Sequence, residues 1–502
     1  MKLYKSNTGE YNLVMAYPAI EAFALSSLGY LWLYKMADTK EGINALRIST
    51  DNISVNSKEI NSISFSMSFD FDYLGVFEIL DKLKIPFFSK DRDDSHPLVF
   101  AGGPVMTTNP MPYSVFFDFI IIGDGENVFN KVTDILMLKM SKSETLKKLS
   151  ELESVYVPEF KNTNKITRAS VSLNNVIYTP IISDKSYFKD TFIIEVSRGC
   201  MNRCAFCTAS YTNLPYRYYD YEKITECIEL GLKHTNKIAL LGAQISAHPR
   251  FNDIMKYISN KISDGINIEL GISSLRTDAI SEQVVQTLVS GGQKHTTIAI
   301  EAASERLRKF INKNLKEEQI LNAVKIAKDN GLKGIKIYSM IGIPTETDQD
   351  IEEFLSLAKK IKQENKGFNI EFSFSTFVPK PQTPLQWAQR EETKSLENKQ
   401  KYLEKKLSKL GVESKFSSAK WDYWQTILSR SDEKIAPLLV EVYKNGGKIG
   451  AYKKAVKTLD IDITKSVNGF DFSDKLPWDC IESNTSKQLL INEINRLSKH
   501  KP

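Results

Sequence analysis

Long stretches of the chain alternate short β-rich apolar runs with helical patterns, and this alternation constrains the fold more than any other feature. In the middle of the chain, β-like runs occur at residues 191–196, 237–241, 267–272, 296–300, 334–340 and 370–377. Helical periodicity separates them at 224–232, 251–262, 281–290, 317–330 and 350–363. Strands that alternate with helices indicate βαβ units and a parallel sheet. Six such units predict an incomplete β/α barrel.

The first part of the chain has the same rhythm. Its β-like runs lie at 11–17, 62–68, 97–101 and 117–122, and its helical patterns lie at 23–36 and 76–83. Two of these runs end in glycine turns, GGP at 102–104 and GDGE at 123–126. Loops at the carboxyl ends of parallel strands line the ligand crevice of open sheets, so both turns are candidate cofactor or substrate contacts. Tight strand-to-helix turns are the alternative.

Changes in this pattern predict three domains. Residues from about 146 to 190 have weaker periodicity and many Asn, Lys, Ser and Thr, as connecting regions do. Beyond Pro384 the chain becomes rich in Lys and Glu, with helical patterns at 391–410 and 437–443. We therefore predict an α/β protein with three parts. They are a Rossmann-like parallel sheet domain at 1–185, a partial (β/α)6 barrel at 186–385 and a mainly helical region at 386–502.

Composition and charge are those of an ordinary globular protein. Hydrophobic residues make up 42% and charged residues 25% of the 502 positions, which excludes disordered and disulfide-framework chains. A formal net charge of +6 over this length gives no support for nucleic acid as a partner. The longest mainly apolar stretch near the start, residues 22–34, is shorter than the about 20 residues that span a bilayer. We predict no membrane partner and a cytoplasmic location.

Three of the five cysteines crowd into one short segment. Cys200, Cys204 and Cys207 directly follow the run at 191–196 with the spacing CxxxCxxC. Three thiolates on one loop can hold three irons of a [4Fe-4S] cluster and leave the fourth iron open to a small ligand. The alternative is a zinc site, whose pattern needs a second pair of ligands. Cys227 and Cys480 stand alone, so the spacing favours the cluster.

This segment resembles the signature of the radical S-adenosylmethionine (SAM) superfamily, in which an aromatic residue, here Phe206, precedes the third cysteine. The resemblance implies a [4Fe-4S] cluster on the three cysteines, with SAM on the open iron through its amino and carboxylate groups. An electron from the cluster, which a reductant such as flavodoxin or ferredoxin would supply, cleaves SAM and starts hydrogen abstraction from a substrate. Phe206 would lie near the adenine, with packing under the loop as the alternative.

Further positions at the ends of the barrel strands match SAM contacts of that superfamily. Gly242 and Ala243 end the second run, where a glycine turn would meet the methionine amino group. Arg276 follows the third run and could pair with the SAM carboxylate, and Glu301 ends the fourth and could accept hydrogen bonds from the ribose. Ile343 lies in the turn after the fifth run and would approach the adenine. A plain turn for the glycine and ion pairs for the charged residues are the alternatives.

The likeness covers nearly the whole chain and narrows to one subgroup. It is carried by GGP, GDGE, SSLRTDAIS, RLRKFINK, MIGIPTETDQD and FVPKPQTPLQW, and by SRSDEK and LPWD near the carboxyl end. These segments resemble radical SAM proteins with an N-terminal cobalamin-binding-like domain. Domains that place a histidine on cobalt carry Asp-x-His-x-x-Gly, and the nearest segment, Asp94-Ser95-His96-Pro97-Leu98-Val99, lacks the glycine. Cobalamin could therefore bind only without that ligation, and the domain could instead be a scaffold or hold substrate.

The leading prediction is a radical SAM enzyme that acts on an unknown substrate, with methyl transfer as the attractive reaction if cobalamin binds. Methylthiolating relatives use extra N-terminal cysteines for a second cluster, and this chain has none before Cys200. RNA modification is a second enzymatic hypothesis without compositional support. A non-catalytic iron-sulfur or zinc scaffold is the alternative from another class.

Overall fold

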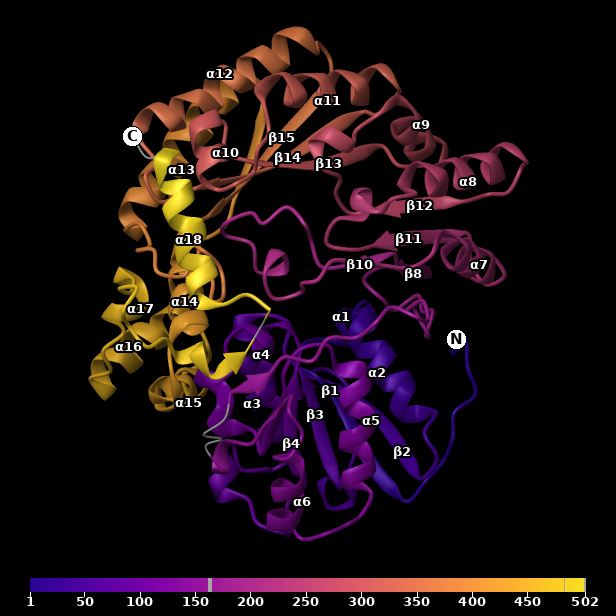
Figure 1. Ribbon diagram of the computed structural model, residues 1–502, viewed down its shortest axis with the longest axis vertical. Helices are drawn as coiled ribbons and strands as arrows, with labels where there is room; N and C mark the ends of the chain where they lie inside the picture. Colours follow the sequence, from indigo (N-terminus) through magenta and orange to yellow (C-terminus); the bar gives the residue numbers. More distant parts are fainter. Residues whose placement is uncertain (161–164, 483, 501–502) are drawn as a thin grey trace.

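A computed structural model describes residues 1–160, 165–482 and 484–500, and the lower half of Figure 1 contains a six-stranded sheet. Its strands are β1 (Tyr11–Tyr17), β2 (Ile43–Ser49), β3 (Ser62–Ser66), β4 (Leu98–Gly102), β5 (Phe119–Ile121) and β6 (Val155–Tyr156). The strand order is β2-β1-β3-β4-β5-β6, with only β6 antiparallel to its neighbour. This is the flavodoxin-like order of a doubly wound sheet, which confirms the predicted parallel sheet.

Both faces of this sheet are covered because its strands alternate their side chains between two apolar clusters. In β1, Leu13 and Met15 face one cluster, whereas Val14 and Ala16 face the other. The first face is covered by α2 (Leu28–Asp38), α5 (Gly125–Leu136) and α6 (Lys142–Leu149), and the second by α3 (Tyr73–Lys82). The remaining helices of this half are α1 (Glu21–Ala24) and α4 (Pro104–Thr108). The helical pattern predicted at 23–36 is thus divided between α1 and α2.

The upper half of Figure 1 is the predicted partial barrel. Its strands are β8 (Thr191–Glu195), β11 (Lys237–Leu241), β12 (Glu269–Ile272), β13 (His295–Glu301), β14 (Gly334–Ile341) and β15 (Asn369–Thr376). All pair in parallel within two sheets, which a bridge between Leu275 and Ile298 links. The helices are α7 (Tyr221–Leu232), α8 (Phe251–Ser263), α9 (Glu282–Ser290), α10 (Glu305–Phe310), α11 (Glu317–Asp329) and α12 (Asp348–Glu364). All six predicted strands are present.

The barrel strands bury one face and leave the other partly open. Along β13, Thr296, Ile298 and Ile300 are buried, while Thr297 and Ala299 between them are only half-buried. The buried set packs with the outer helices, so the half-buried set faces the barrel interior. This interior ends at the carboxyl ends of the strands, where the site described below is built.

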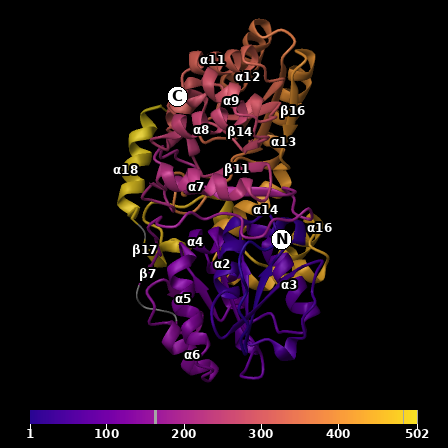
Figure 2. The same ribbon diagram turned by 90° about the vertical axis from the view of Figure 1, so that its right-hand side faces the viewer.

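The C-terminal region is mainly helical, as predicted, and packs against both halves. Its elements are α13 (Thr393–Lys409), β16 (Glu413–Phe416), α14 (Ala419–Arg430), α15 (Ala436–Lys444), α16 (Ile449–Leu459), α17 (Thr464–Asn468), β17 (Ile481–Glu482) and α18 (Lys487–Leu497). β16 adds a parallel strand beside β15. In Figures 1 and 2, α14 and α16 lie beside the N-terminal sheet domain, and their apolar side chains join the cluster of α3.

Short strands complete the connections between these parts. They are β7 (Ile166–Thr167), which pairs with β17, and the antiparallel pair β9 (Ser197–Arg198) and β10 (Arg217–Tyr218). Across the interface with the C-terminal region, the Tyr73 and Tyr452 hydroxyls form a buried hydrogen bond of 2.6 Å. Among the described residues, no helix has the length and apolar composition that crossing a membrane requires.

Candidate active site

The three clustered cysteines lie on a partly buried loop beyond the carboxyl end of β8, here called the cysteine loop (residues 199–207). Gly199 starts it with φ 82°, and a Cβ at this position would lie 2.3 Å from the Asn213 carbonyl oxygen. Glycine is therefore required both by the backbone conformation and by this close approach. Cys200 and Cys204 are buried, and Cys207 is half-buried.

The thiols of this loop are within electrostatic reach of one another, as a shared cluster requires. Burial raises the pKa of Cys204 to about 12, although the Lys313 ammonium lowers it, and Cys200 and Cys207 both contribute to the rise. Burial also raises the pKa of Cys207. Thiols in such surroundings are protonated until a metal binds, so assembly of a cluster would release protons. Three thiols on one loop fit the donor set of an iron-sulfur cluster.

The described residues show no group of three or more His, Cys, Asp or Glu side chains placed to hold one metal ion. In this structure the Cys200 thiol lies 3.2 Å from the Gln244 side-chain oxygen, and the Asn202 amide donates to the Cys200 sulfur. Gln244 follows directly after Gly242 and Ala243. The turn after β11 therefore contacts the cysteine loop.

The structure places the predicted SAM-contacting residues around this loop. A Cβ on Gly242 would lie 2.7 Å from the Ser197 hydroxyl, so the turn packs closely on β9, and Ala243 is exposed. Phe206 packs against an apolar cluster that contains Ala205 and Ile343. The aromatic residue of the loop and the turn after β14 are thus brought together, as the resemblance implies.

The two charged residues among these predictions both form ion pairs. The Arg276 guanidinium donates two hydrogen bonds, of 2.8 and 2.6 Å, to the Asp278 carboxylate. Glu301 lies at an irregular end of β13, with φ 66° and a register shift after Ala299, and binds the Lys313 ammonium at 3.0 Å. A bulge of this kind re-aims a side chain at the end of a strand. The ion-pair alternative is therefore realised at both positions.

Lys313 is a charged residue of the site that the sequence analysis missed. Burial alone would lower its pKa, but Glu301 and the Cys204 thiol raise it above the ordinary value. Its side chain is 12% exposed and lies within electrostatic reach of Arg276 as well. Lys313 lies in the loop between α10 and α11, where no periodicity or motif spacing in the sequence indicates that a lysine is buried. The run RLRKFINK contains it but gives no reason to single it out.

Residues that flank the cysteine loop line a cavity of about 530 Å³, here called the sheet-edge cavity. It is lined by the ends of the N-terminal strands, by both glycine turns and by residues that follow the cysteine loop, including Thr208 and Ala209. Gly103 and Gly123 adopt φ 109° and 97°, which a tight turn requires. The turns are therefore tight and they line a cavity, while their contact with a cofactor or substrate stays a prediction.

The acidic side chains of the GDGE turn are bound to the segment that leads into the cysteine loop. The Arg198 guanidinium lies 3.1 Å from Asp124, 2.8 Å from Glu126 and 2.9 Å from Glu195. Burial would lower the pKa of Arg198, but these carboxylates raise it instead. Arg217 also binds Asp124, at 2.7 Å. This charge cluster ties the sheet domain to the barrel.

Two family descriptions match the chain, and one relative matches most of its length. "Radical SAM proteins, N-terminal" covers residues 34–158, and "Radical SAM superfamily" covers residues 194–358. An uncharacterized protein of Methanocaldococcus jannaschii is 31% identical over 403 residues, which are 79% of this chain and 84% of that protein. The chain belongs to the radical SAM superfamily.

A further relative and two solved structures extend the comparison. An uncharacterized methyltransferase of Pyrococcus horikoshii is 29% identical over 54% of this chain and 60% of that protein. The cobalamin-dependent SAM radical enzyme OxsB, solved with aqua-cobalamin, has a TM-score of 0.59 at 14% identity, covering 98% of this chain and 79% of its own. The methyltransferase TsrM of Kitasatospora setae has a TM-score of 0.52 at 12% identity, covering 74% and 75%. These two share the fold.

As a radical SAM enzyme, the protein uses a [4Fe-4S] cluster, SAM, a reductant and a substrate. The scaffold alternative is not favoured by these comparisons. Ligation by Cys200, Cys204 and Cys207, and the SAM contacts of the residues around them, stay predictions. His96 lies before the amino end of β4, whereas the sheet-edge cavity lies at the carboxyl end, and His96 is not among its lining residues.

Proposed function

We propose that this radical SAM enzyme carries its cluster on Cys200, Cys204 and Cys207 and binds SAM between the cysteine loop and the ends of β11 to β14. The observation that carries this proposal is the convergence of these elements, since the loop contacts the turn after β11 and packs on the turn after β14. When bound, the cluster and SAM supply hydrogen-abstraction chemistry that begins with one-electron cleavage of SAM.

The chain's own residues would bind and orient SAM in this arrangement. Phe206 and Ile343 offer apolar surface to the adenine, and the turn at Gly242 and Ala243 offers backbone groups to the methionine end. Glu301 would accept hydrogen bonds from ribose hydroxyls. Lys313 sits beside both Glu301 and Cys204, so its ammonium could pair with the SAM carboxylate without losing Glu301.

The sheet-edge cavity supports cobalamin as a further cofactor and methyl transfer as the reaction. It lies at the carboxyl edge of a doubly wound sheet, where such folds bind their ligands, and its lining includes Arg198 and Thr208 on either side of the cysteine loop. OxsB and TsrM were solved with cobalamin, and the relative from Pyrococcus horikoshii is named as a methyltransferase. Since no histidine is among the residues that line the cavity in the described chain, cobalamin would bind here without a protein histidine on cobalt.

Electron paramagnetic resonance tests the radical SAM site without knowledge of the substrate. The protein is purified anaerobically, reduced with dithionite and measured before and after SAM is added. We expect a reduced cubane signal that changes with SAM. A cluster whose signal ignores SAM would contradict SAM binding at the open iron. A flavodoxin or ferredoxin is the donor we expect in place of dithionite.

Cobalamin binding is tested separately by incubating the protein with hydroxocobalamin and recording the visible spectrum after gel filtration. Gly29 lines the sheet-edge cavity on α2, and a Cβ there would meet no atom within 4 Å. Gly29→Leu should therefore place an apolar side chain at the cavity wall without backbone strain and reduce retention of cobalamin. Gly450→Leu is the matched control, because Gly450 lies in α16, outside the cavity lining, and is equally unobstructed. Equal retention by both variants, or none by the wild type, would contradict cobalamin at this site.

A further inference from the structure

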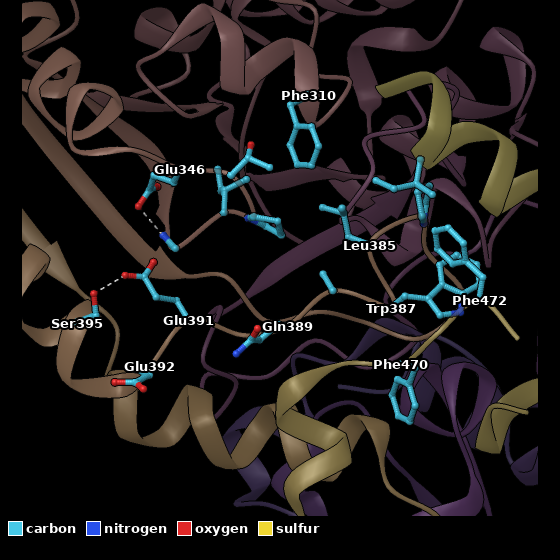
Figure 3. A pocket seen from close by; sticks show the side chains of 17 residues that line it. Phe310, Glu346, Leu385, Trp387, Gln389, Glu391, Glu392, Ser395, Phe470 and Phe472 are labelled. Atoms are coloured by element: carbon cyan, nitrogen blue, oxygen red, sulfur yellow. Dashed lines mark hydrogen bonds between the residues drawn. The ribbon is translucent and has the colours of Figure 1, made fainter. Parts of the chain in front are cut away.

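Two large cavities of the protein differ in how their charged side chains are paired. The larger, of about 840 Å³, opens at the carboxyl end of β14 and is lined by Glu346 and Glu391, among others (Figure 3). Both carboxylates bind the Lys399 ammonium, at 2.7 Å each, and the Ser395 hydroxyl also donates to Glu391. These two carboxylates therefore already share a cation. The sheet-edge cavity, in contrast, is lined by a buried cation that has no carboxylate of its own.

That cation is the Arg168 guanidinium, and the residue is 7% exposed. Its stem lies against the GDGE turn, since a Cβ on Gly123 would lie 2.7 Å from the Arg168 Cγ. Its head donates to the Tyr211 carbonyl at 3.3 Å and to the Leu214 carbonyl at 3.1 Å. Arg168 forms no ion pair with a described carboxylate, and burial lowers its pKa although Asp124 opposes this. A buried charge of this kind is costly unless it is paired.

Part of the Arg168 guanidinium is still free to bind a ligand. A guanidinium has five N–H groups, and the two carbonyls accept from one group on each terminal nitrogen. The Nε–H donates to no described residue, yet Nε is not among the fully buried atoms that lack a partner, so it is accessible. Because the residue lines the cavity and is otherwise buried, this accessible part faces the cavity.

The carboxylates of the sheet-edge cavity are already bound by other arginines. Arg198 binds all three of them, and Arg217 binds the second oxygen of Asp124 at 2.7 Å. Three arginines and three carboxylates line the cavity, so the formal charge of its lining is zero. A ligand with several negative charges is therefore disfavoured, whereas a single negative charge placed against Arg168 would pair the one arginine that lacks a carboxylate contact.

Other buried arginines show that burial without an ion pair is not enough to make a ligand site. Arg308, Arg390 and Arg430 are at most 1% exposed, line neither cavity and form no ion pair among the described residues. Each donates to backbone carbonyls and keeps a fully buried nitrogen without a partner. A ligand has no access to these three side chains. Arg168 differs from them because an accessible N–H group faces a cavity.

We propose that Arg168 binds a singly charged anionic group of the ligand in the sheet-edge cavity, and that this group is the phosphodiester of cobalamin. The guanidinium fork matches the oxygens of a phosphate group. Asn213 also lines the cavity, and since its side-chain oxygen accepts from Thr212 at 3.2 Å, its amide is available as a second donor. The identity of the ligand rests on the proposed function, but the anion contact does not. A phosphorylated substrate would offer the same group.

Two corrinoids test this contact on the full-length protein under anaerobic conditions. Hydroxocobalamin carries the phosphodiester, whereas aquacobinamide lacks the nucleotide arm that contains it. Titrations followed by the visible spectrum give a Kd for each. Arg168→Met should weaken hydroxocobalamin binding about tenfold or more, as loss of a hydrogen bond to a charged group does, and leave aquacobinamide binding unchanged. Arg168→Lys keeps the charge but not the fork, so its affinity for hydroxocobalamin should lie between those of the wild type and Arg168→Met.

Arg250→Met is the matched control, because Arg250 is 47% exposed and lies outside the cavity lining. It should change neither affinity. Equal weakening of both corrinoids by Arg168→Met, or unchanged binding of hydroxocobalamin, would overturn the proposal, since a purely structural role affects both ligands alike. Circular dichroism verifies that the variants are folded. If Arg168→Met does not fold, Arg168→Lys is judged by the same comparison of the two corrinoids.

Inorganic phosphate distinguishes failure of this proposal from failure of the proposed cofactor. If the wild type binds neither corrinoid, the assignment of cobalamin to this cavity is wrong, and the anion contact is tested with phosphate at constant ionic strength. Phosphate should then raise the Tm of the wild type more than that of the Arg168 variant, which would indicate a phosphorylated substrate. An equal effect on both proteins would overturn the anion contact. Neither result depends on the paramagnetic resonance test, which probes the cluster.

Discussion

Replacing Arg198 by methionine removes one cation that forms ion pairs with three carboxylates. Arg198 binds Asp124 and Glu126 of the sheet domain and Glu195 of the first barrel strand, all within 3.1 Å. The four side chains are between 13% and 17% exposed, so water screens them only in part. Methionine keeps most of the apolar stem of arginine, and the change therefore isolates the charge.

The expected loss of stability arises because the substitution leaves partly buried carboxylates without their cation. Removing one partner of a buried ion pair costs about 3–5 kcal/mol, because the remaining charge stays desolvated without compensation. Here the site is slightly exposed and Arg217 still binds Asp124 at 2.7 Å. We therefore expect Arg198→Met to lower the free energy of unfolding by about 2–4 kcal/mol at pH 7.

The free energy of unfolding that Arg198→Met removes should be smaller at low pH than at pH 7. Burial would raise the pKa of Asp124, but Arg198 and Arg217 outweigh it and hold the pKa below its ordinary value. A carboxylate with a depressed folded-state pKa stabilises the protein above its unfolded pKa, and this stability disappears as pH falls through the folded value. The difference between wild type and Arg198→Met should thus be full at pH 7 and shrink below about pH 4.

Urea unfolding at pH 7 and at about pH 3, below the ordinary pKa of an aspartate, measures both quantities by circular dichroism. Arg250→Met is the control, because Arg250 also bridges two carboxylates but is 47% exposed. Exposed pairs contribute about 1 kcal/mol or less. The reasoning is refuted if Arg198→Met costs no more than Arg250→Met, or if its cost is the same at both pH values.

Three further outcomes follow from the structure. Cys204→Ala should lose the cluster, measured as iron per chain, yet keep its circular dichroism spectrum, because the main barrel core does not include Cys204; global unfolding would favour a structural metal. Lys313→Gln should weaken SAM binding, measured by the paramagnetic resonance titration, while Lys309→Gln, on the exposed side of α10, should not. Tyr452→Phe should lower the free energy of unfolding by about 1–3 kcal/mol, measured by urea, since it leaves the buried Tyr73 hydroxyl without its partner.

Local periodicity was enough to predict the barrel, because each of its strands is a short apolar run between clear helical patterns. Of the described strands longer than two residues, two were not predicted. β2 (Ile43–Ser49) includes Asn44 and Arg47 and lies at the sheet edge, where only part of the strand is buried. β16 has only four residues, Glu413–Phe416, within a charged region. Strands that bury little apolar surface carry little pattern.

Contacts between helices and sheets that are distant in the sequence could not be predicted either, for a different reason. The apolar faces of α14, α15 and α16 predict that these helices are buried, but a face does not specify what covers it. The structure packs them on α3 of the N-terminal sheet domain. The division at residues 185 and 385 therefore stays a prediction about chain segments, and the cores of the folded protein combine segments from both ends of the chain.

The cysteine loop shows why spacing predicts donor atoms but not the geometry of a site. The Ala205 amide donates to the Ile311 carbonyl at 2.9 Å, and the Ala205 carbonyl accepts from the Leu385 amide at 3.2 Å. Tyr211, just after the loop, is buried in a cluster with Trp387 and other C-terminal residues. Together with the Arg198 charge cluster, these contacts fix the loop from the sheet domain, the barrel and the C-terminal region at once. Since the orientation of the thiols depends on all three, substitutions at any of these contacts should disturb the cluster without touching a cysteine.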